Sequence, residues 1–503
     1  MLLLLDSTTK MESNFLFFLV VAFIGTSIVL LLPNQRRRYA FGKPIHFRHR
    51  RATSGSKTPP RSLSPGKIRS GNVTDPDYSG VYPPSRRFVL ANIPGLAQNL
   101  DKTVEQLSNY PEKKGEDVPF LSELQDAKKT MMTPCGFSVE EIKALGDFPD
   151  YASLSGIPLP GPYLNFDISR AKPRPYRPFR WSYHQTMSIT KMESEWWLEL
   201  ESTYKGRVME RQELFRRHGK GVLDALPGSQ FACKELMEMV LQFLCARYPQ
   251  HFRLNTEAMI FHNDLLGTKS NLKAMHPLHV LLNNIPEDFA IMIRDPDNGY
   301  YSFRAGIICS ALGWNLGSKI GMSLREIHSP IPDYKEKMQF SMDRYFAKKP
   351  THKAIQRGSW GLEVDQPLYM PPGDPHEKHR DMQMNDLDIS RCHLRVDWQT
   401  LRRMPLSGAV VFNFKALFTP VESFREEPFV PALVLKVLNE SKRSLMEYKN
   451  TWHVEHVVKP ALEEYAKEQV EKGLVPEDWE VQTLDESPWF PGWEEKWKRE
   501  QGF

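Results

Sequence analysis

The chain of 503 residues opens with a uniformly apolar run and only later shows periodic patterns. Residues 15 to 32 contain no charged side chain. As a helix rising about 1.5 Å per residue, this run would extend about 27 Å, close to the roughly 30 Å of a bilayer's hydrocarbon core. Three arginines, Arg36, Arg37 and Arg38, follow it. The pattern predicts a membrane anchor over residues 1–33, with the rest of the chain on the cytosolic side. We expect a single-pass protein of the endoplasmic reticulum.

Periodic patterns in the remaining chain predict both helices and strands. Apolar residues recur at helical spacing over residues 194–217 and 234–249, and each range is expected to form a helix. The same spacing over residues 431–473 predicts two amphipathic helices. Residues 288–312 indicate two strands joined by the turn sequence DPDNG, and residues 409–418 indicate another strand. The expected fold class is α+β, an antiparallel sheet with helices packed around it.

Composition and charge divide the chain further. Five cysteines are too few for a disulfide scaffold, and apolar and charged contents of 41% and 25% are those of a globular protein. Residues 34–71 hold eleven basic and no acidic residues and are rich in Ser and Pro. We interpret 34–85 as a disordered basic linker that faces anionic lipid, and we expect no nucleic-acid partner, because the anchor ties the linker to a membrane. Residues 86–173 contain proline-rich stretches and one capping box, at Ser138, and predict an extended segment that wraps the domain.

Common cofactor motifs are missing from the sequence. It contains no GxGxxG, GxxxxGK[ST], GxSxG or HExxH motif and no CxxC pair. Asp295 and Asp297 match the DxD pattern that holds a divalent metal in many sugar-nucleotide transferases, although DPDNG favours a turn. A lumenal glycosyltransferase using these two aspartates is therefore an alternative hypothesis. It needs the opposite membrane topology, in which the sequons at Asn72 and Asn439 would be open to glycosylation. Histidine pairs at 376/379 and 453/456 are more typical of surface histidines than of metal ligands.

Two segments carry candidate chemistry. His328 lies in EIHSPIP, where two following prolines fix the chain direction, and such a histidine could be an axial haem ligand or a structural residue. Residues 393–405, HLRVDWQTLRRMP, are dense in hydrogen-bond donors. An arginine cluster of this kind could clamp carboxylates or could form a solvated helix face.

Four ordered blocks within residues 174–425 carry a resemblance to a known family. They are WWLELESTYKGRVMERQEL with LPGSQFACKELMEMVLQFLCARYPQHF, AGIICSALGWNLGSKIGMSLREIHSPIPDYKEKMQFSMDRYF, RGSWGLEVDQPLY, and HLRVDWQTLRRMPLSGAVVFNFKAL. The chain resembles the alpha-subunit-like family of haem-dependent oxidative N-demethylases, including its fungal HRQ-type members. The His, Arg and Gln of that label correspond to His393, Arg395 and Gln399.

The resemblance implies a PAS-like antiparallel sheet domain over residues 174–425 that binds haem b, followed by a helical extension over 426–503. It implies oxygen-dependent removal of a methyl group from an amine, with electrons from a separate flavin or iron–sulfur reductase. His328 becomes the candidate axial ligand to the haem iron, and Arg395 and Gln399 become the catalytic candidates. Further cofactor-binding candidates are Arg402, Trp314, Lys319 and Trp360.

Two positions depart from the family pattern. Trp398 stands where the family usually has Arg, and Asp397 where it usually has Glu. These departures leave the substrate open, either an amine or a secondary metabolite. A PAS-like haem sensor without turnover is a further alternative.

Overall fold

The computed structural model describes residues 75–86, 132–181 and 188–502. The predicted membrane anchor and nearly all of the predicted basic linker therefore lie outside the described residues. Within the described ranges, no helix is both long and apolar enough to cross a membrane. The fold below is that of the compact unit formed by residues 76–503.

A seven-stranded antiparallel sheet organises this unit, which confirms the α+β class. Its strand order is β1-β8-β9-β10-β6-β7-β2. The strands are β1 (Thr190–Lys191), β2 (Leu223–Ala225), β6 (Asp288–Arg294), β7 (Tyr301–Ile307), β8 (Ile355–Val364), β9 (Cys392–Arg403) and β10 (Val410–Pro420). A second, three-stranded sheet contains β3 (Phe252–Asn255), β4 (Ile260–Asn263) and β5 (Thr268–Asn271).

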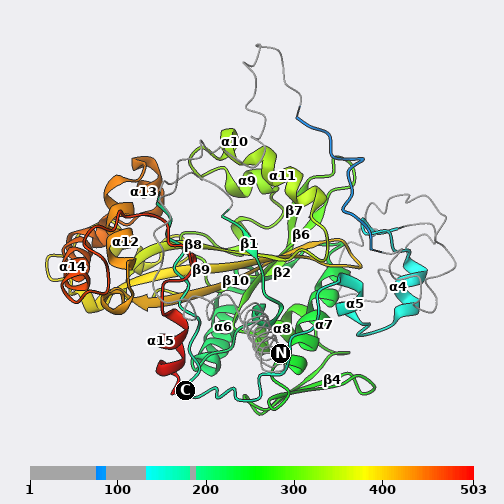
Figure 1. The fold of residues 1–503 in the computed structure, drawn as a ribbon. Coiled ribbons are helices and arrows are strands. Elements are labelled where there is room, and N and C mark those ends of the chain that lie inside the picture. Colours follow the sequence, from blue (N-terminus) through cyan, green and yellow to red (C-terminus); the bar gives the residue numbers. More distant parts are fainter. Residues whose placement is uncertain (1–74, 87–131, 182–187, 503) are drawn as a thin grey trace, which may run out of the picture. The chain divides into compact units, whose positions relative to one another are not determined.

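Helices cover both faces of the large sheet (Figure 1). One face carries α9 (Leu324–His328), α10 (Tyr334–Lys337) and α11 (Gln339–Lys348). The other carries α6 (Tyr204–His218), α7 (Gln230–Arg247) and α8 (Pro277–Asn284), with α12 (Val430–Glu440), α13 (Arg443–Lys449) and α14 (Trp452–Glu471) gathered at one end of the sheet. The remaining helices are α4 (Val139–Leu145), α5 (Tyr151–Ser155) and α15 (Trp493–Glu500).

Several elements begin and end where the sequence predicts. Ser138 caps α4 through a complete capping box with Glu141. The DPDNG sequence joins β6 to β7, because the Asp295 carboxylate accepts hydrogen bonds from the backbone N–H of Asp297 at 2.9 Å and from the amide of Asn298 at 3.1 Å. The predicted strand near residue 409 is β10.

Two helical predictions were wrong in extent. The helix expected over 194–217 begins only at Tyr204, after a short 3-10 turn at Ser194–Trp196. The intervening residues run as buried chain beneath the sheet, where Trp197 is 1% exposed, so core packing overrides the helical pattern. The C-terminal section forms three helices, α12 to α14, where two were expected.

A buried ion pair fixes the end of β7 and the loop that follows. Arg211 of α6 donates to Asp288, and both side chains are at most 2% exposed. The second Asp288 oxygen accepts from the backbone N–H groups of Cys309 and Ser310 at 2.9 and 2.7 Å. Because a broken buried pair leaves an uncompensated charge, this arrangement is strongly held, and it places the Ser310 carbonyl toward β9.

Glu287, fully buried next to that pair, makes the stability of the core depend on pH. One of its oxygens accepts from the Glu199 backbone N–H at 3.2 Å, and the other has no hydrogen-bond partner in the described ranges. Burial raises the pKa of Glu287 to about 7, against the opposing charge of Lys415. Between pH 4.5 and 7 the folded chain holds a proton that the unfolded chain has released, so the free energy of unfolding falls as pH rises through this window.

Glu287→Gln is expected to remove this dependence, because the amide stays neutral. The variant should match the wild type near pH 5 and exceed it by on the order of 2–3 kcal/mol at pH 8, measured by urea unfolding. Glu447→Gln, at a side chain that is 62% exposed, is the control. An unchanged pH slope in Glu287→Gln would contradict the prediction.

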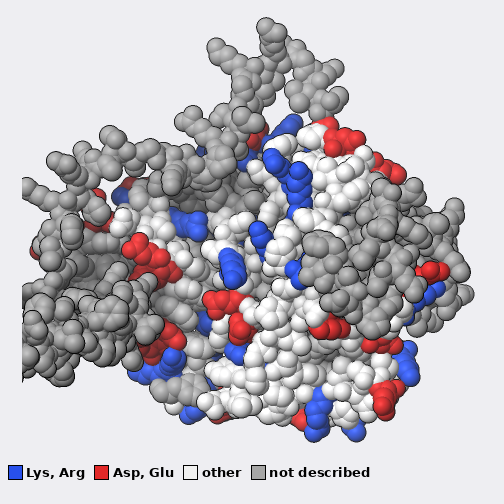
Figure 2. Space-filling view, turned by 45° about the vertical axis from the view of Figure 1, so that its right-hand side comes forward, with Lys and Arg blue, Asp and Glu red and all other residues white. Residues whose placement is uncertain are grey.

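Basic and acidic side chains are interspersed over the described surface that Figure 2 shows. No single sign of charge dominates the described part of this view. The body of the protein thus differs in charge pattern from the basic segment 34–71.

Candidate functional site

His328 is the last residue of α9. This short helix starts at a complete capping box between Ser323 and Glu326, and Pro330 follows it closely. The His328 Nδ1 lies 2.7 Å from the carbonyl oxygen of Leu324. A carbonyl only accepts, so Nδ1 carries the hydrogen of the neutral ring and Nε2 carries the lone pair. The backbone of α9 therefore fixes both the tautomer and the direction of the imidazole.

The surroundings of His328 keep the ring neutral. Burial, helped by the nearby charges of Arg357 and Lys319, lowers the pKa of His328 to about 4 against the opposing effect of the hydrogen bond to Leu324. The ring of Tyr334 stacks on the imidazole, with centroids 5.3 Å apart. At neutral pH the Nε2 lone pair is therefore available to a metal, as in haem ligation.

The sheet surface below α9 contributes a polar and aromatic floor. Gln399 of β9 lies between Arg357 of β8 and Phe414 of β10 in the strand register. Phe412 and Phe414 pack against the core on this face and remain partly exposed, as do Arg357 and Gln399. The Gln399 side chain makes no hydrogen bond with any residue that the structure describes, so its amide is available to a ligand.

Trp314 and Lys319 flank the same region. The Lys319 ammonium lies 4.1 Å from the centroid of the Trp314 ring, a cation–π contact. Burial lowers the pKa of Lys319, and its charge in turn acts on His328. The structure thus brings together three of the residues singled out from the sequence, His328, Trp314 and Lys319.

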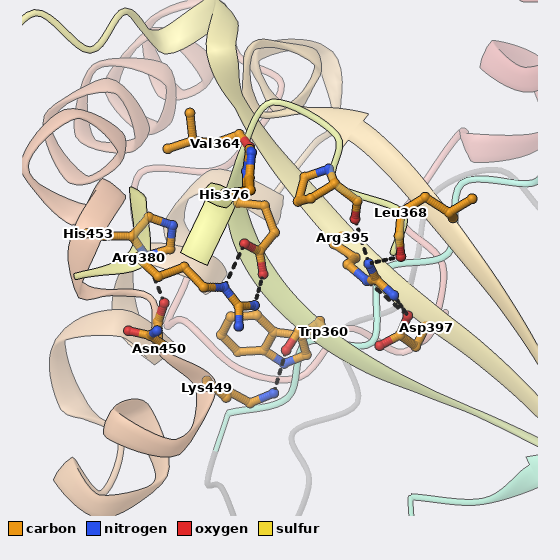
Figure 3. A network of polar contacts seen from close by, with 12 residues as sticks. Trp360, Val364, Leu368, His376, Arg380, Arg395, Asp397, Lys449, Asn450 and His453 are labelled. Carbon is orange, nitrogen blue, oxygen red and sulfur yellow. Dashed lines mark hydrogen bonds and ion pairs between the residues drawn. The ribbon is translucent and has the colours of Figure 1, made fainter. Parts of the chain in front are cut away.

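Arg395 lies on the same face of β9 as Gln399, but its guanidinium already has protein partners (Figure 3). It donates to the carbonyl oxygens of Pro367 at 2.7 Å, Leu368 at 3.1 Å and Ser310, and to the Asp397 carboxylate at 2.9 Å. The side chain is 3% exposed. This geometry makes Arg395 a clamp that holds the 367–368 loop and the Ser310 loop against β9.

Trp360 and Arg402 lie on the opposite face of the sheet. Trp360 packs in a core with Phe179, at 4.9 Å between ring centroids, and the Arg402 guanidinium lies 4.0 Å from the ring of Trp197. Neither side chain can contact a ligand that lies on the His328 face. His393 is buried at the start of β9, with Nε2 3.3 Å from the amide of Gln366.

The helix-face interpretation of residues 393–405 was wrong, because these residues form β9. Sequence reasoning also missed Arg357, Tyr334 and the Phe412/Phe414 pair. Alternation along β8 and β10 would have found Arg357 and the two phenylalanines once the strands were known. Nothing in the sequence pattern signals the stacking of Tyr334 on His328.

Other candidate metal positions give no site among the described residues. Asp295 and Asp297 form the β6–β7 turn, as their hydrogen bonds show. His376 donates from Nε2 to the Val364 carbonyl at 3.1 Å and lies in the polar network of Figure 3. Within the described ranges, no three His, Cys, Asp or Glu side chains are grouped in a way that could hold a metal ion.

The His328 face matches the needs of a haem. A neutral imidazole with a fixed Nδ1–H is the donor that haem iron takes, and Arg357 and Lys319 supply cations for propionates. Phe412 and Phe414 offer apolar surface for a macrocycle.

Residues 188–459 match the family model described as haem-dependent oxidative N-demethylase, alpha subunit-like. The chain belongs to this family. The match spans β8, β9 and β10 and α9 with His328, so the demethylase-like region contains every residue of the site described above. Membership in this family indicates an oxidoreductase that uses haem.

Proposed function

We propose that the chain is a haem-dependent oxidative N-demethylase of the HRQ type that acts on an N-methylated amine or a related secondary metabolite. The observation that carries the proposal is the His328 imidazole, held neutral with Nδ1–H on the Leu324 carbonyl. Its Nε2 would ligate the iron of haem b. Arg357 and Lys319 would hold the propionates.

Haem, when bound, supplies oxygen activation and the oxidising equivalents for attack on a methyl group. The chain's own residues then have four tasks. His328 fixes the position of the iron, and the Phe412/Phe414 pair keeps water from the apolar side. The Gln399 amide, on the sheet surface below α9, would orient the substrate or another hydrogen-bonding group in the site. Arg395 keeps the loops around Leu368 and Ser310 in place.

Partners and location extend this proposal. The described residues would hold the haem and shape its pocket, and electrons would come from a separate flavin or iron–sulfur reductase. The apolar run at residues 15–32 would anchor the protein in the endoplasmic reticulum membrane, with the basic segment 34–71 on the cytosolic leaflet.

Formaldehyde release tests the proposal. The full chain is loaded with haem and given oxygen, and its electrons come from a reductase and not from dithionite. Under these conditions it is expected to release formaldehyde from N-methylated amines. Oxygen binding without any reductase-dependent product would contradict a demethylase and favour a sensor.

Gln399→Leu separates chemistry from haem binding. Loss of one positioned hydrogen-bond donor in an active site is expected to lower turnover by about 10²-fold, while the haem content stays equal to that of the wild type. Gln212→Leu, which changes an exposed glutamine bonded to Asn283 on the other side of the sheet, is the control. Equal turnover in the two variants would show that Gln399 has no role in the reaction.

A further inference from the structure

Arg402 is a buried cation without an anionic partner. The residue is 8% exposed, and its guanidinium makes no hydrogen bond and no ion pair with any residue that the structure describes. Its guanidinium carbon lies 4.0 Å from the centroid of the Trp197 ring. Burial lowers the pKa of Arg402 to about 9, so the side chain is still charged at neutral pH. Buried charges in proteins are otherwise paired, because an isolated one is costly.

The neighbours of Arg402 form a row of further buried polar groups without partners. Gln356, Thr400 and Asn413 lie side by side across β8, β9 and β10. They are at most 4% exposed. The Gln356 carbonyl oxygen, the Thr400 hydroxyl and both polar atoms of the Asn413 amide have no hydrogen-bond partner among the residues that the structure describes. Arg402 stands two residues from Thr400 and therefore faces the same side of the sheet.

Trp197 completes the group from the segment that covers this face. It is 1% exposed, and its indole N–H likewise has no hydrogen-bond partner within the described part of the chain. Native proteins leave few buried polar atoms unsatisfied, so a cluster of them around one cation calls for an explanation. Buried water would satisfy the amides and the hydroxyl, but it would not balance the charge of Arg402.

A second basic residue, Lys349, lies near Arg402. Burial lowers the pKa of Lys349 to about 7, with the nearby charges of Arg403 and Arg402 acting in the same direction, and its amine donates to the Tyr345 hydroxyl at 3.0 Å and to the Lys353 carbonyl. Neither of these acceptors carries a negative charge at neutral pH. Neither Arg402 nor Lys349 thus forms an ion pair with a carboxylate of any residue that the structure describes.

We infer that Arg402, Gln356, Thr400, Asn413 and Trp197 form a binding site for a small hydroxy- or aminocarboxylate on the sheet face opposite His328. The carboxylate oxygens would accept from the guanidinium, the Asn413 amide and the Trp197 indole N–H. The two side-chain carbonyls, of Gln356 and Asn413, would accept from a hydroxyl or ammonium group of the same molecule. The site is independent of haem on the His328 face.

Thermal unfolding of the full chain in lactate tests this inference, with acetate and chloride at equal ionic strength for comparison. Lactate is expected to raise Tm saturably, by about 2–5 °C, acetate by less and chloride not at all. No saturable lactate shift beyond that of chloride would overturn the inference.

Haem propionates are carboxylates too, and a second arm distinguishes them from a free carboxylate. The lactate shift is expected to be the same with and without bound haem. If haem abolishes the lactate shift, a propionate fills the site and the inference of a separate site fails. The proposed function depends only on haem binding. If the protein binds haem, that proposal stands even when lactate gives no shift of Tm.

Variants of Arg402 give opposite signs for the two explanations of its burial. If the role of Arg402 is to bind an anion, Arg402→Met should raise Tm in carboxylate-free buffer, and the variant should no longer show the lactate shift of Tm. If Arg402 serves only to pack on Trp197, the variant should lower Tm and the wild type should ignore lactate. Arg443→Met, at a side chain that is 93% exposed, should keep the shift.

Thr400→Val, which nearly preserves side-chain volume, should weaken lactate binding about tenfold, and unchanged binding would overturn the assignment of Thr400.

Discussion

His328→Ala is expected to abolish the Soret band of the haem-loaded protein. The imidazole is the one side chain in the described site whose nitrogen lone pair is both neutral and directed by a backbone bond, from Nδ1 to Leu324 at 2.7 Å. Removing it leaves the iron without a protein ligand, so haem affinity should fall by about 100-fold or more. Titration of the purified full chain with haemin, followed by absorbance, measures the effect.

His453→Ala is the matched control for that experiment. His453 is also buried, and its Nδ1 also lies close to a backbone carbonyl, that of Asn450 at 2.9 Å (Figure 3). It belongs to α14, away from the His328 face. The control should keep the Soret band, and added imidazole should restore a band in His328→Ala. A normal Soret band in His328→Ala would assign the axial ligand to another residue.

Arg403→Met is expected to cost about 3–5 kcal/mol of unfolding free energy. Arg403 is fully buried and donates to the Tyr301 hydroxyl at 2.7 Å and to the carbonyls of Gly408 at 2.6 Å, Lys349 at 2.5 Å and Phe346. Methionine would leave three buried carbonyls without donors. Since two of these carbonyls lie at the end of α11, the loss would also loosen that helix, which packs on the same face of the sheet as α9.

Chemical denaturation of Arg403→Met and Arg402→Met measures the contrast between two adjacent arginines. The first should lower the denaturation midpoint strongly, and the second should not. A similar loss in both variants would mean that burial alone, and not the hydrogen bonds, decides the stability that each arginine contributes.

The sheet and its turns were largely predictable from the sequence, because local signals agree with the fold there. DPDNG between two apolar runs specifies the β6–β7 hairpin, and the alternation after residue 409 specifies β10. Strand β9 could not be recognised in this way. Both of its faces are buried, and both carry polar side chains such as Gln399 and Arg402, so the two-residue period of hydrophobic residues is hidden.

The site was predictable only in part. The prolines after His328 indicated a fixed histidine, and the capping box at Ser323 is the local reason for its place at the end of α9. The role of Arg395 depends on which carbonyls lie opposite β9, and these come from loops about 27 and 85 residues away. Such distant partners leave no trace in spacing.

The two faces of β9 carry different sets of side chains, so the effect of a deletion in this strand should depend on whether an odd or an even number of residues is removed. A one-residue deletion early in this strand would turn Gln399 toward α6–α8 and Arg402 toward α9, exchanging the contents of two chemically different compartments. A two-residue deletion would keep each side chain in its own compartment and shift it by one row. Length changes within β9 should therefore be better tolerated in even steps than in odd ones.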